Sequence, residues 1–333
     1  MPRPDKDILF VLQKLGLIQA DEHTRLTPLK GGVGSDIYKV QVNDRVFVVK
    51  RALHKLRVSA NWEAPIERSK YEVDWLRTVG SILPDSVPRI LAYDGTSGVF
   101  AMEYCPPASF GIWKNDLMAG KVNKRFAAHI GEKLVAIHSR AANDPPLAKR
   151  FQTDHIFYAI RLEPYFVALS EKHPLVGNKL LQLSNKTLAC HLSLVHGDMS
   201  PKNILVGPNG PVFIDAECAW FGDPAFDVAF CLNHLLLKCI LRRSAAPDLL
   251  DAFDTLAATY LEGVDWEPQS TVEGRVGELL PALLLARVDG KSPVEYITDE
   301  SDRNLVRETA IPFILEPPAT PFALRTAWSR NFF

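Results

Sequence analysis

The pattern of apolar and polar positions changes in character about one third of the way along the chain. In residues 7–18 the apolar positions recur at helical spacing, and residues 26–53 alternate as expected for a meander of three antiparallel strands with glycine and Asn43-Asp44 turns. A helix and two further strands are predicted after the meander, over residues 65–79, 89–93 and 98–104.

From about residue 116 onward the apolar positions are mostly spaced as in helices. Residues 124–141, 157–169 and 227–243 each predict a helix, and residues 204–215 form the exception, a turn-bounded pair of apolar runs typical of a β-hairpin. Consecutive prolines, Pro106 and Pro107, suit a hinge between the strand-rich part and the mostly helical part of the chain. The sequence therefore predicts an α+β protein with a small β-sheet lobe, residues 1–104, and a larger helical lobe, residues 105–333.

Composition and charge exclude several classes of function. Of 333 residues 47% are hydrophobic and 23% are charged, and the net charge of −1 gives no indication of nucleic-acid binding or of an anionic membrane surface. No apolar run reaches the roughly 18 residues that span a bilayer. Gln13 and Lys14 interrupt the apolar stretch that a signal peptide would need. Five cysteines without a C-x-x-C pair favour reduced thiols, so we expect a cytoplasmic protein without a zinc site.

Polar side chains gather around the predicted hairpin. His196 and Asp198 follow an apolar run, and Asn203 comes five residues later, so a loop of this size brings Asp198 and Asn203 together. A carboxylate can accept a proton from a hydroxyl, and an amide oxygen is a ligand for hard metal ions. The hairpin returns Asp215 and Glu217 to the neighbourhood of Asn203, which gives an oxygen-rich set suited to Mg²⁺.

The order H-x-D-x4-N, hairpin, D resembles the catalytic loop and metal-binding segment of the protein-kinase-like superfamily. HGD at residues 196–198, the D-x-E pair at 215–217 and the following GDPAFDVA resemble more closely the aminoglycoside-phosphotransferase-type small-molecule kinases, which include choline, homoserine and methylthioribose kinases. The resemblance implies a bilobal protein-kinase-like fold, with Asp198 as catalytic base and with metal ligands at Asn203, Asp215 and Glu217. It also implies that His196 is a scaffold residue and that Asp227 braces the catalytic loop.

The same polar residues could serve only as caps and structural partners. We favour the catalytic interpretation because five polar residues stand in the required order on both sides of the hairpin.

The first lobe supplies the expected partners for a nucleotide. The resemblance implies that the glycine turn covers the phosphates of ATP, through Gly31, Gly32, Gly34 and Ser35. Lys50 ends a strand at the position where the superfamily keeps its phosphate-binding lysine. Glu72 is the expected helix partner of Lys50, and Glu67 is the alternative. The backbone at the hinge is expected to hold the adenine edge, over Met102, Glu103, Tyr104 and Cys105.

Two features indicate that the acceptor is a small hydroxylated molecule and not a protein. Gly197 replaces the arginine by which phosphorylation-regulated protein kinases bind an activation loop, and only eleven residues separate Asp215 from Asp227. Basic residues near the C-terminus, Arg325 and Arg330, do not suit a polycationic acceptor.

A cluster at the end of a late helix leaves two alternatives open. Arg287, Asp289 and Lys291 either contact an anionic acceptor or are ordinary charges at a helix C-terminus, and the second interpretation is favoured.

The sequence thus predicts transfer of the γ-phosphoryl group of ATP, or of GTP, with Mg²⁺, to a hydroxyl of a sugar, amino alcohol, hydroxy acid or antibiotic. Two alternatives are a kinase-like nucleotide-binding module without transfer activity and an enzyme that transfers AMP to protein. The sequence assigns no oligomeric state.

Overall fold

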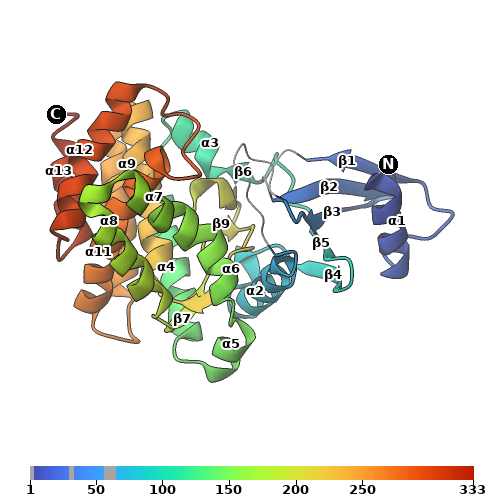
Figure 1. The fold of residues 1–333 in the computed structure, drawn as a ribbon. Helices are drawn as coiled ribbons and strands as arrows, with labels where there is room; N and C mark the ends of the chain where they lie inside the picture. The colour runs from blue at the N-terminus through green and yellow to red at the C-terminus, as the bar shows by residue number, and fades with distance from the viewer. Residues whose placement is uncertain (1–3, 30–33, 56–64) are drawn as a thin grey trace.

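The computed structural model describes residues 4–29, 34–55 and 65–333. Two lobes are evident in Figure 1, with the larger sheet in one and most of the helices in the other. The protein is therefore an α+β protein with the bilobal kinase-like architecture that the sequence predicts.

The N-terminal lobe is built on a five-stranded antiparallel sheet with the strand order β1-β2-β3-β5-β4. Its strands are β1 (Thr24–Pro28), β2 (Ser35–Val42), β3 (Arg45–Ala52), β4 (Ile90–Asp94) and β5 (Val99–Glu103). Alternate residues such as Val40, Val42 and Val49 are fully buried and form a small core with α1 (Pro4–Lys14). Consecutive residues of β3 from Phe47 to Lys50 are also buried, so both faces of this central strand are covered there.

Helix α2 (Arg68–Ile82) lies at the junction of the lobes (Figure 1). Its buried residues Trp75, Leu76 and Val79 belong to the core of the helical lobe and not to the core beneath the sheet. Because the helix is anchored in this core, its N-terminal half is held in a fixed position between the two lobes.

The C-terminal lobe is mainly helical and is packed around α9 (Ala225–Leu241), in which every residue from Ala225 to Ile240 is buried. A helix that is apolar on all sides must be surrounded by other elements. The other α-helices of this lobe are α3 (Trp113–Met118), α4 (Lys124–Ala141), α5 (Pro145–Arg150), α6 (Asp154–Phe157), α7 (Ala168–Lys172), α8 (Pro174–Leu188), α10 (Ala246–Glu262), α11 (Gln269–Asp289), α12 (Glu300–Leu315) and α13 (Pro321–Ser329).

Short strands carry the loop and the hairpin that the sequence singles out. Antiparallel pairs join β7 (Ser193–Val195) to β10 (Trp220–Gly222), and β8 (Ile204–Gly207) to both β9 (Gly210–Phe213) and β6 (Gly111–Ile112). At the base of the hairpin the Ile214 N–H donates to the Asn203 carbonyl oxygen at 3.0 Å. This bond brings the segments that carry Asn203 and Asp215 side by side.

One predicted helix differs from the observed one. The helix expected over residues 157–169 is divided into α6, a π-helical segment labelled η2 (Tyr158–Val167) and α7. Pro164 lies inside the π-helical segment. Because proline has no N–H to donate, the regular α-helical pattern is interrupted here.

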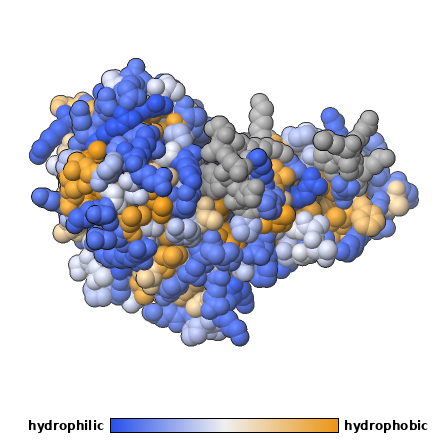
Figure 2. Space-filling model, in the orientation of Figure 1, coloured by the Kyte–Doolittle hydropathy of each residue, from blue (hydrophilic) through white to orange (hydrophobic). Residues whose placement is uncertain are grey.

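The surface and the thiols add two observations. In Figure 2 hydrophilic residues cover most of the visible face of the helical lobe, with smaller apolar groups between them. No helix in the described ranges combines the length and apolar character needed to cross a membrane.

All five cysteines are free thiols, and Cys218, Cys231 and Cys239 are buried.

Candidate active site

The loop that carries His196 and Asp198 begins where β7 ends, and His196 is fully buried in it. The Nδ1 atom of His196 accepts from the Asp198 N–H at 3.1 Å, and Nε2 donates to the Ile214 carbonyl oxygen at 3.0 Å. Burial lowers the pKa of His196, against the nearby charges of Asp227 and Asp198. The neutral ring therefore fastens the loop to the strand end that precedes Asp215.

Asp227 braces the same loop from the first turn of α9. Its two carboxylate oxygens accept the N–H groups of His196 at 2.7 Å and of Gly197 at 2.8 Å. Two charge-assisted bonds to consecutive amides fix the direction in which the chain reaches Asp198.

Gly197 has a steric reason to be glycine. Its backbone φ is +76°, and a Cβ atom at this position would lie 2.6 Å from the carbonyl oxygen of Cys218. An arginine at this position, as in phosphorylation-regulated protein kinases, would fit neither this conformation nor this space.

The carboxylate of Asp198 lines a cavity and is held by two cations. Its Oδ2 atom lies 3.0 Å from Arg161 Nη2 and 3.1 Å from Lys202 Nζ, whereas Oδ1 accepts no hydrogen bond from the described residues. Burial opposes the charge, but Lys202 and Arg161 outweigh it and lower the pKa of Asp198. Asp198 is therefore an ionised carboxylate. Its Oδ2 atom is held by two cations, and its Oδ1 atom accepts no hydrogen bond from the described residues.

Asn203 and Asp215 offer oxygen ligands of the kind that Mg²⁺ prefers. Asn203 donates through Nδ2 to the Asp198 carbonyl oxygen at 3.0 Å, which leaves its amide oxygen as an acceptor. Asp215 contacts Lys50 through Oδ1 and has a strained φ of +67°. Burial raises its pKa, but the charges of Lys50 and Lys202 outweigh burial and hold the pKa of Asp215 below its usual range.

The fit of these donors to a metal ion can be judged from their number. The described residues contain no group of three or more His, Cys, Asp or Glu side chains arranged for a metal ion. Two protein oxygen donors suit a Mg²⁺ ion that takes its remaining ligands from substrate phosphates and water, and they do not suit an ion held by protein alone.

Glu217 faces a different partner from Asn203 or Asp215. Its Oε2 atom accepts from Arg68 Nε at 3.0 Å, and Arg68 also donates to the carbonyl oxygens of Gly34 at 2.6 Å and Leu53 at 2.7 Å. The predicted metal contact of Glu217 stays a prediction. The observed contact links the catalytic segment to the end of the glycine turn.

Lys50 and Glu72 form a buried ion pair at the junction of the lobes. The Lys50 Nζ atom lies 2.8 and 2.7 Å from the two carboxylate oxygens of Glu72. Burial alone would lower the pKa of Lys50, but the carboxylates of Asp215, Glu72 and Glu217 outweigh it and raise that pKa. The alternative partner, Glu67, instead bonds His155 at 2.8 Å.

The other described residues predicted to hold the nucleotide lie at or next to the ends of β2 and β5. Gly34 and Ser35 stand at the start of β2, and Gly31 and Gly32 lie outside the described residues. Met102 and Glu103 end β5, and Tyr104 and Cys105 follow it into the second lobe. Their predicted contacts with the adenine edge and the phosphates stay predictions.

Two arginines of the site escaped the sequence analysis. Arg161 is buried in the π-helical segment, where it also donates to the carbonyl oxygen of Gly197 and contacts Asp198. Arg68 is 1% exposed and begins α2. Arginine in a helix is ordinarily solvated, so only its position inside a predicted apolar face could have drawn attention to it.

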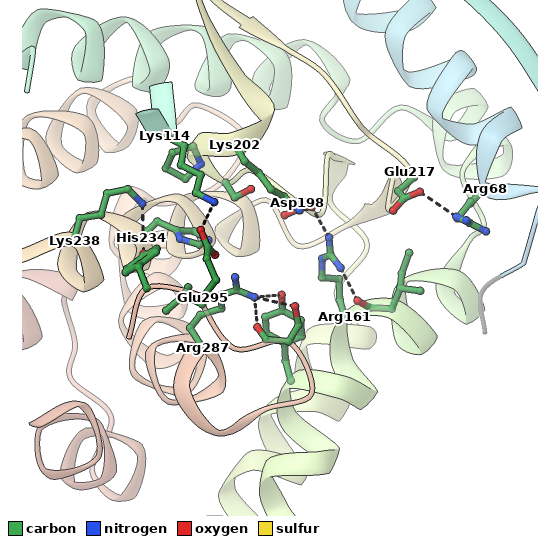
Figure 3. Close-up of a pocket in the computed structure, with 17 residues that line it drawn as sticks. Arg68, Lys114, Arg161, Asp198, Lys202, Glu217, His234, Lys238, Arg287 and Glu295 are labelled. Carbon is green, nitrogen blue, oxygen red and sulfur yellow. Dashed lines mark hydrogen bonds and ion pairs between the residues drawn. The ribbon is translucent and has the colours of Figure 1, made fainter. Parts of the chain in front are cut away.

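The cavity beside Asp198 holds about 770 Å³ of space, part of it open to solvent. As Figure 3 shows, it extends from Glu217 and Arg68 at one end, past Asp198, to His234 and Lys238 at the other.

The fold and the site together define a kinase-like phosphotransferase that acts on small molecules. A model of the APH phosphotransferase enzyme family matches residues 25–268. The chain belongs to this phosphotransferase enzyme family.

Curated relatives share about a quarter of the sequence. The methylthioribose kinase of Yersinia pseudotuberculosis serotype O:1b (strain IP 31758) is 25% identical over 278 residues, which cover 70% of this chain and 67% of the relative. The methylthioribose kinase of Bacillus pumilus (strain SAFR-032) is 24% identical over 279 residues, which cover 75% of this chain and 70% of the relative.

Solved structures share the fold at lower identity. The amicoumacin kinase hAmiN, in complex with AMP-PNP, Ca²⁺ and Ami, aligns with a TM-score of 0.57 at 13% identity and covers 98% of this chain and 97% of its own. A choline/ethanolamine kinase family protein from Mesorhizobium loti aligns with a TM-score of 0.53 at 15% identity, and the alignment covers 97% of this chain and 99% of that protein.

Proposed function

We propose that this enzyme transfers the γ-phosphoryl group of ATP to a hydroxyl group of a small molecule, with Asp198 as the catalytic base. The observation that carries the proposal is the state of the Asp198 carboxylate. It is ionised, it lines the cavity, and its Oδ2 atom lies next to the cations of Arg161 and Lys202. The Oδ1 atom, which accepts no hydrogen bond from the described residues, is the proposed acceptor for the proton of a substrate hydroxyl.

In the proposed reaction Asp198 orients the hydroxyl and accepts its proton while the hydroxyl oxygen bonds to the γ-phosphorus. The bond from this phosphorus to the β–γ bridging oxygen breaks, and ADP leaves. Arg161 positions Asp198 by holding both its carboxylate and the preceding carbonyl group. Positioning and electrostatic stabilisation supply most of the rate enhancement in phosphoryl transfer.

The nucleotide is proposed to bind between the lobes, with residues 1–104 above it and residues 105–333 below. Lys50, held by Glu72, would bind phosphate oxygens, and the Gly34–Ser35 turn would cover them. The backbone of residues 102–105 would hold the adenine edge. Asn203 and Asp215 would hold Mg²⁺, which neutralises charge on the phosphates when bound.

The position of a radioactive label tests this proposal against its alternatives. Purified enzyme is incubated with ATP labelled at the α- or the γ-phosphorus and with pools of sugars, amino alcohols, hydroxy acids and antibiotics. We expect γ-label in a small molecule and none of the α-label in protein. Transfer of α-label to protein would indicate AMP transfer, and nucleotide binding without any transfer would indicate a binding module. Either result contradicts the proposal.

A further inference from the structure

The cavity beside Asp198 carries an excess of positive charge. Among the described residues that line it, six basic side chains face three carboxylates. Each carboxylate already has a cationic partner, because Asp198 contacts Arg161 and Lys202, Glu217 contacts Arg68, and Glu295 contacts Lys114. Lys238 and Arg287 are the two cations of this lining that have no carboxylate partner in the described part of the chain.

Lys238 is a buried ammonium group on α9. The residue is 1% exposed, and the only hydrogen bond of its ammonium group within the described ranges goes to the Tyr296 hydroxyl at 3.4 Å, with the ring of Tyr296 centred 5.0 Å away. Burial of an ammonium ion without a counter-ion is costly. The fold therefore places a lysine at a position where stability alone favours an apolar side chain.

Arg287 lies on α11 beside the same space and is bound by neutral groups only. Its Nη1 atom donates to the Tyr165 hydroxyl at 2.9 Å and to the carbonyl and hydroxyl oxygens of Ser292, while its buried Nε atom has no hydrogen-bond partner among the residues that the structure describes. Within the same residues the buried Nε2 atom of His234 has no hydrogen-bond partner either. Figure 3 shows these three side chains together on the far side of the cavity from Glu217 and Arg68.

Two other charges near Arg287 do not take part. Asp289 is bound by Lys172, His173 and Arg307, and Lys291 contacts Glu163. Of the cluster that the sequence singled out, only Arg287 lines the cavity.

We propose that Lys238 and Arg287, with His234, bind a phosphate or carboxylate group of the acceptor, so that the substrate is an anionic hydroxylated molecule. This inference rests on the proposed function, since it places the acceptor hydroxyl at Asp198 and its oxyanion at the other end of the same cavity. The unpaired ammonium and guanidinium groups acquire their counter-ion from the substrate. An acceptor carrying an ammonium group would meet like charges there.

The protonation of Lys238 gives the binding a pH dependence. Burial, reinforced by the charge of Lys114, lowers the pKa of Lys238 to about 7. The other charged and titratable groups that face it are Glu295, Arg287, Cys231 and Tyr296. A bound anion stabilises the ammonium form, so the free protein must take up a proton above pH 7. Because only the ammonium form binds the anion, affinity should fall about fiftyfold between pH 7 and pH 9.

Calorimetric titrations with three probes test the inference without ATP. The probes are glycerol 3-phosphate, glycerate and, as the neutral control, glycerol. We expect one or both anions to bind and glycerol not to bind, and the two anions distinguish a phosphate from a carboxylate substrate. Lys238→Met and Arg287→Met should each weaken binding at least tenfold, and Lys238→Met should remove the pH dependence. Lys186→Met, which removes an exposed lysine on α8, should change neither the affinity for the anions nor the pH dependence of binding.

The outcomes distinguish failure of the anionic-acceptor inference from failure of the proposed function. If neither anion binds, or if both bind equally well to the Lys238→Met and Arg287→Met proteins, the inference is wrong. Circular dichroism measures whether each variant is folded. If anions bind as expected but Asp198→Asn retains full transfer activity, the proposed function fails. If transfer depends on Asp198 but proceeds to neutral acceptors at rates independent of Lys238, only the anionic-acceptor inference fails.

Discussion

At the residue scale, Gly197 shows how a single missing side chain shapes the site. The sequence suggested only that an arginine is absent, whereas the structure gives the reason, which is a positive φ and a carbonyl oxygen 2.6 Å from where a Cβ would lie. The loop can reach Asp198 in its observed direction only if this position has no side chain.

We expect Gly197→Ala to lower kcat about a hundredfold, because the displaced loop moves the carboxylate of Asp198. Gly16→Ala is the matched control, since Gly16 has a φ of +68° but nothing within 4 Å of an added Cβ. The control should lose about 1–2 kcal/mol of stability from backbone strain and retain its kcat. Steady-state kinetics and thermal unfolding of both variants check this, and equal kcat values would refute the steric account.

Residue identity also limits what a sequence can reveal. Asp198, Asn203 and Asp215 could be singled out because their order around a hairpin is unusual. Arg161 could not, because nothing in its local sequence shows that a π-helical segment turns it toward Asp198. Interactions between distant segments decide which arginines are buried.

At the scale of elements, local periodicity was sufficient for most of the fold. The helix predicted over residues 124–141 is the observed α4, and the predicted meander is the observed β1-β2-β3. The exception is the helix predicted over residues 157–169, where hydrophobic spacing does not distinguish α- from π-helical turns.

The packing of α4 against α10 provides a prediction at this scale. A Cβ at Gly131 of α4 would lie 2.8 Å from the Leu256 carbonyl oxygen of α10. Gly131→Ala should therefore lower the free energy of unfolding by about 1–3 kcal/mol, because the two helices must move apart. In Gly274→Ala, on α11, the nearest atom is 4.0 Å away, so this control should gain up to about 1 kcal/mol. Denaturant titrations measure both, and a stabilised Gly131→Ala protein would show that the contact is not tight.

At the scale of the whole molecule, the two lobes are joined by ion pairs as well as by the chain. Arg68 connects Glu217 of the catalytic segment to the carbonyl oxygen of Gly34, and Lys50 connects Glu72 to Asp215. The sequence predicted the two lobes, but the Arg68 link depends on long-range contacts that periodicity does not encode. The lobe boundary after residue 104 stays a prediction.

A double-mutant cycle tests whether Arg68 and Glu217 are energetically coupled. From Arg68→Met, Glu217→Gln and the double variant we expect a coupling energy of about 1–2 kcal/mol, because both groups are largely removed from water. The exposed pair Lys70–Asp74 on the same helix is the matched control and should give roughly 0.3–0.5 kcal/mol. A coupling no larger than that of the control would show that Glu217 is free for the predicted metal contact.

The central claim is that Asp198 is the base in phosphoryl transfer to a small hydroxylated acceptor. The most direct test is the rate of transfer from γ-labelled ATP to the best acceptor for wild type, Asp198→Asn and, as control, Asp251→Asn on the exposed face of α10. We predict a loss of about 10²–10⁴-fold for Asp198→Asn, the usual contribution of a general base, with nucleotide binding retained and the control unchanged. Transfer by Asp198→Asn at the wild-type rate would contradict the account.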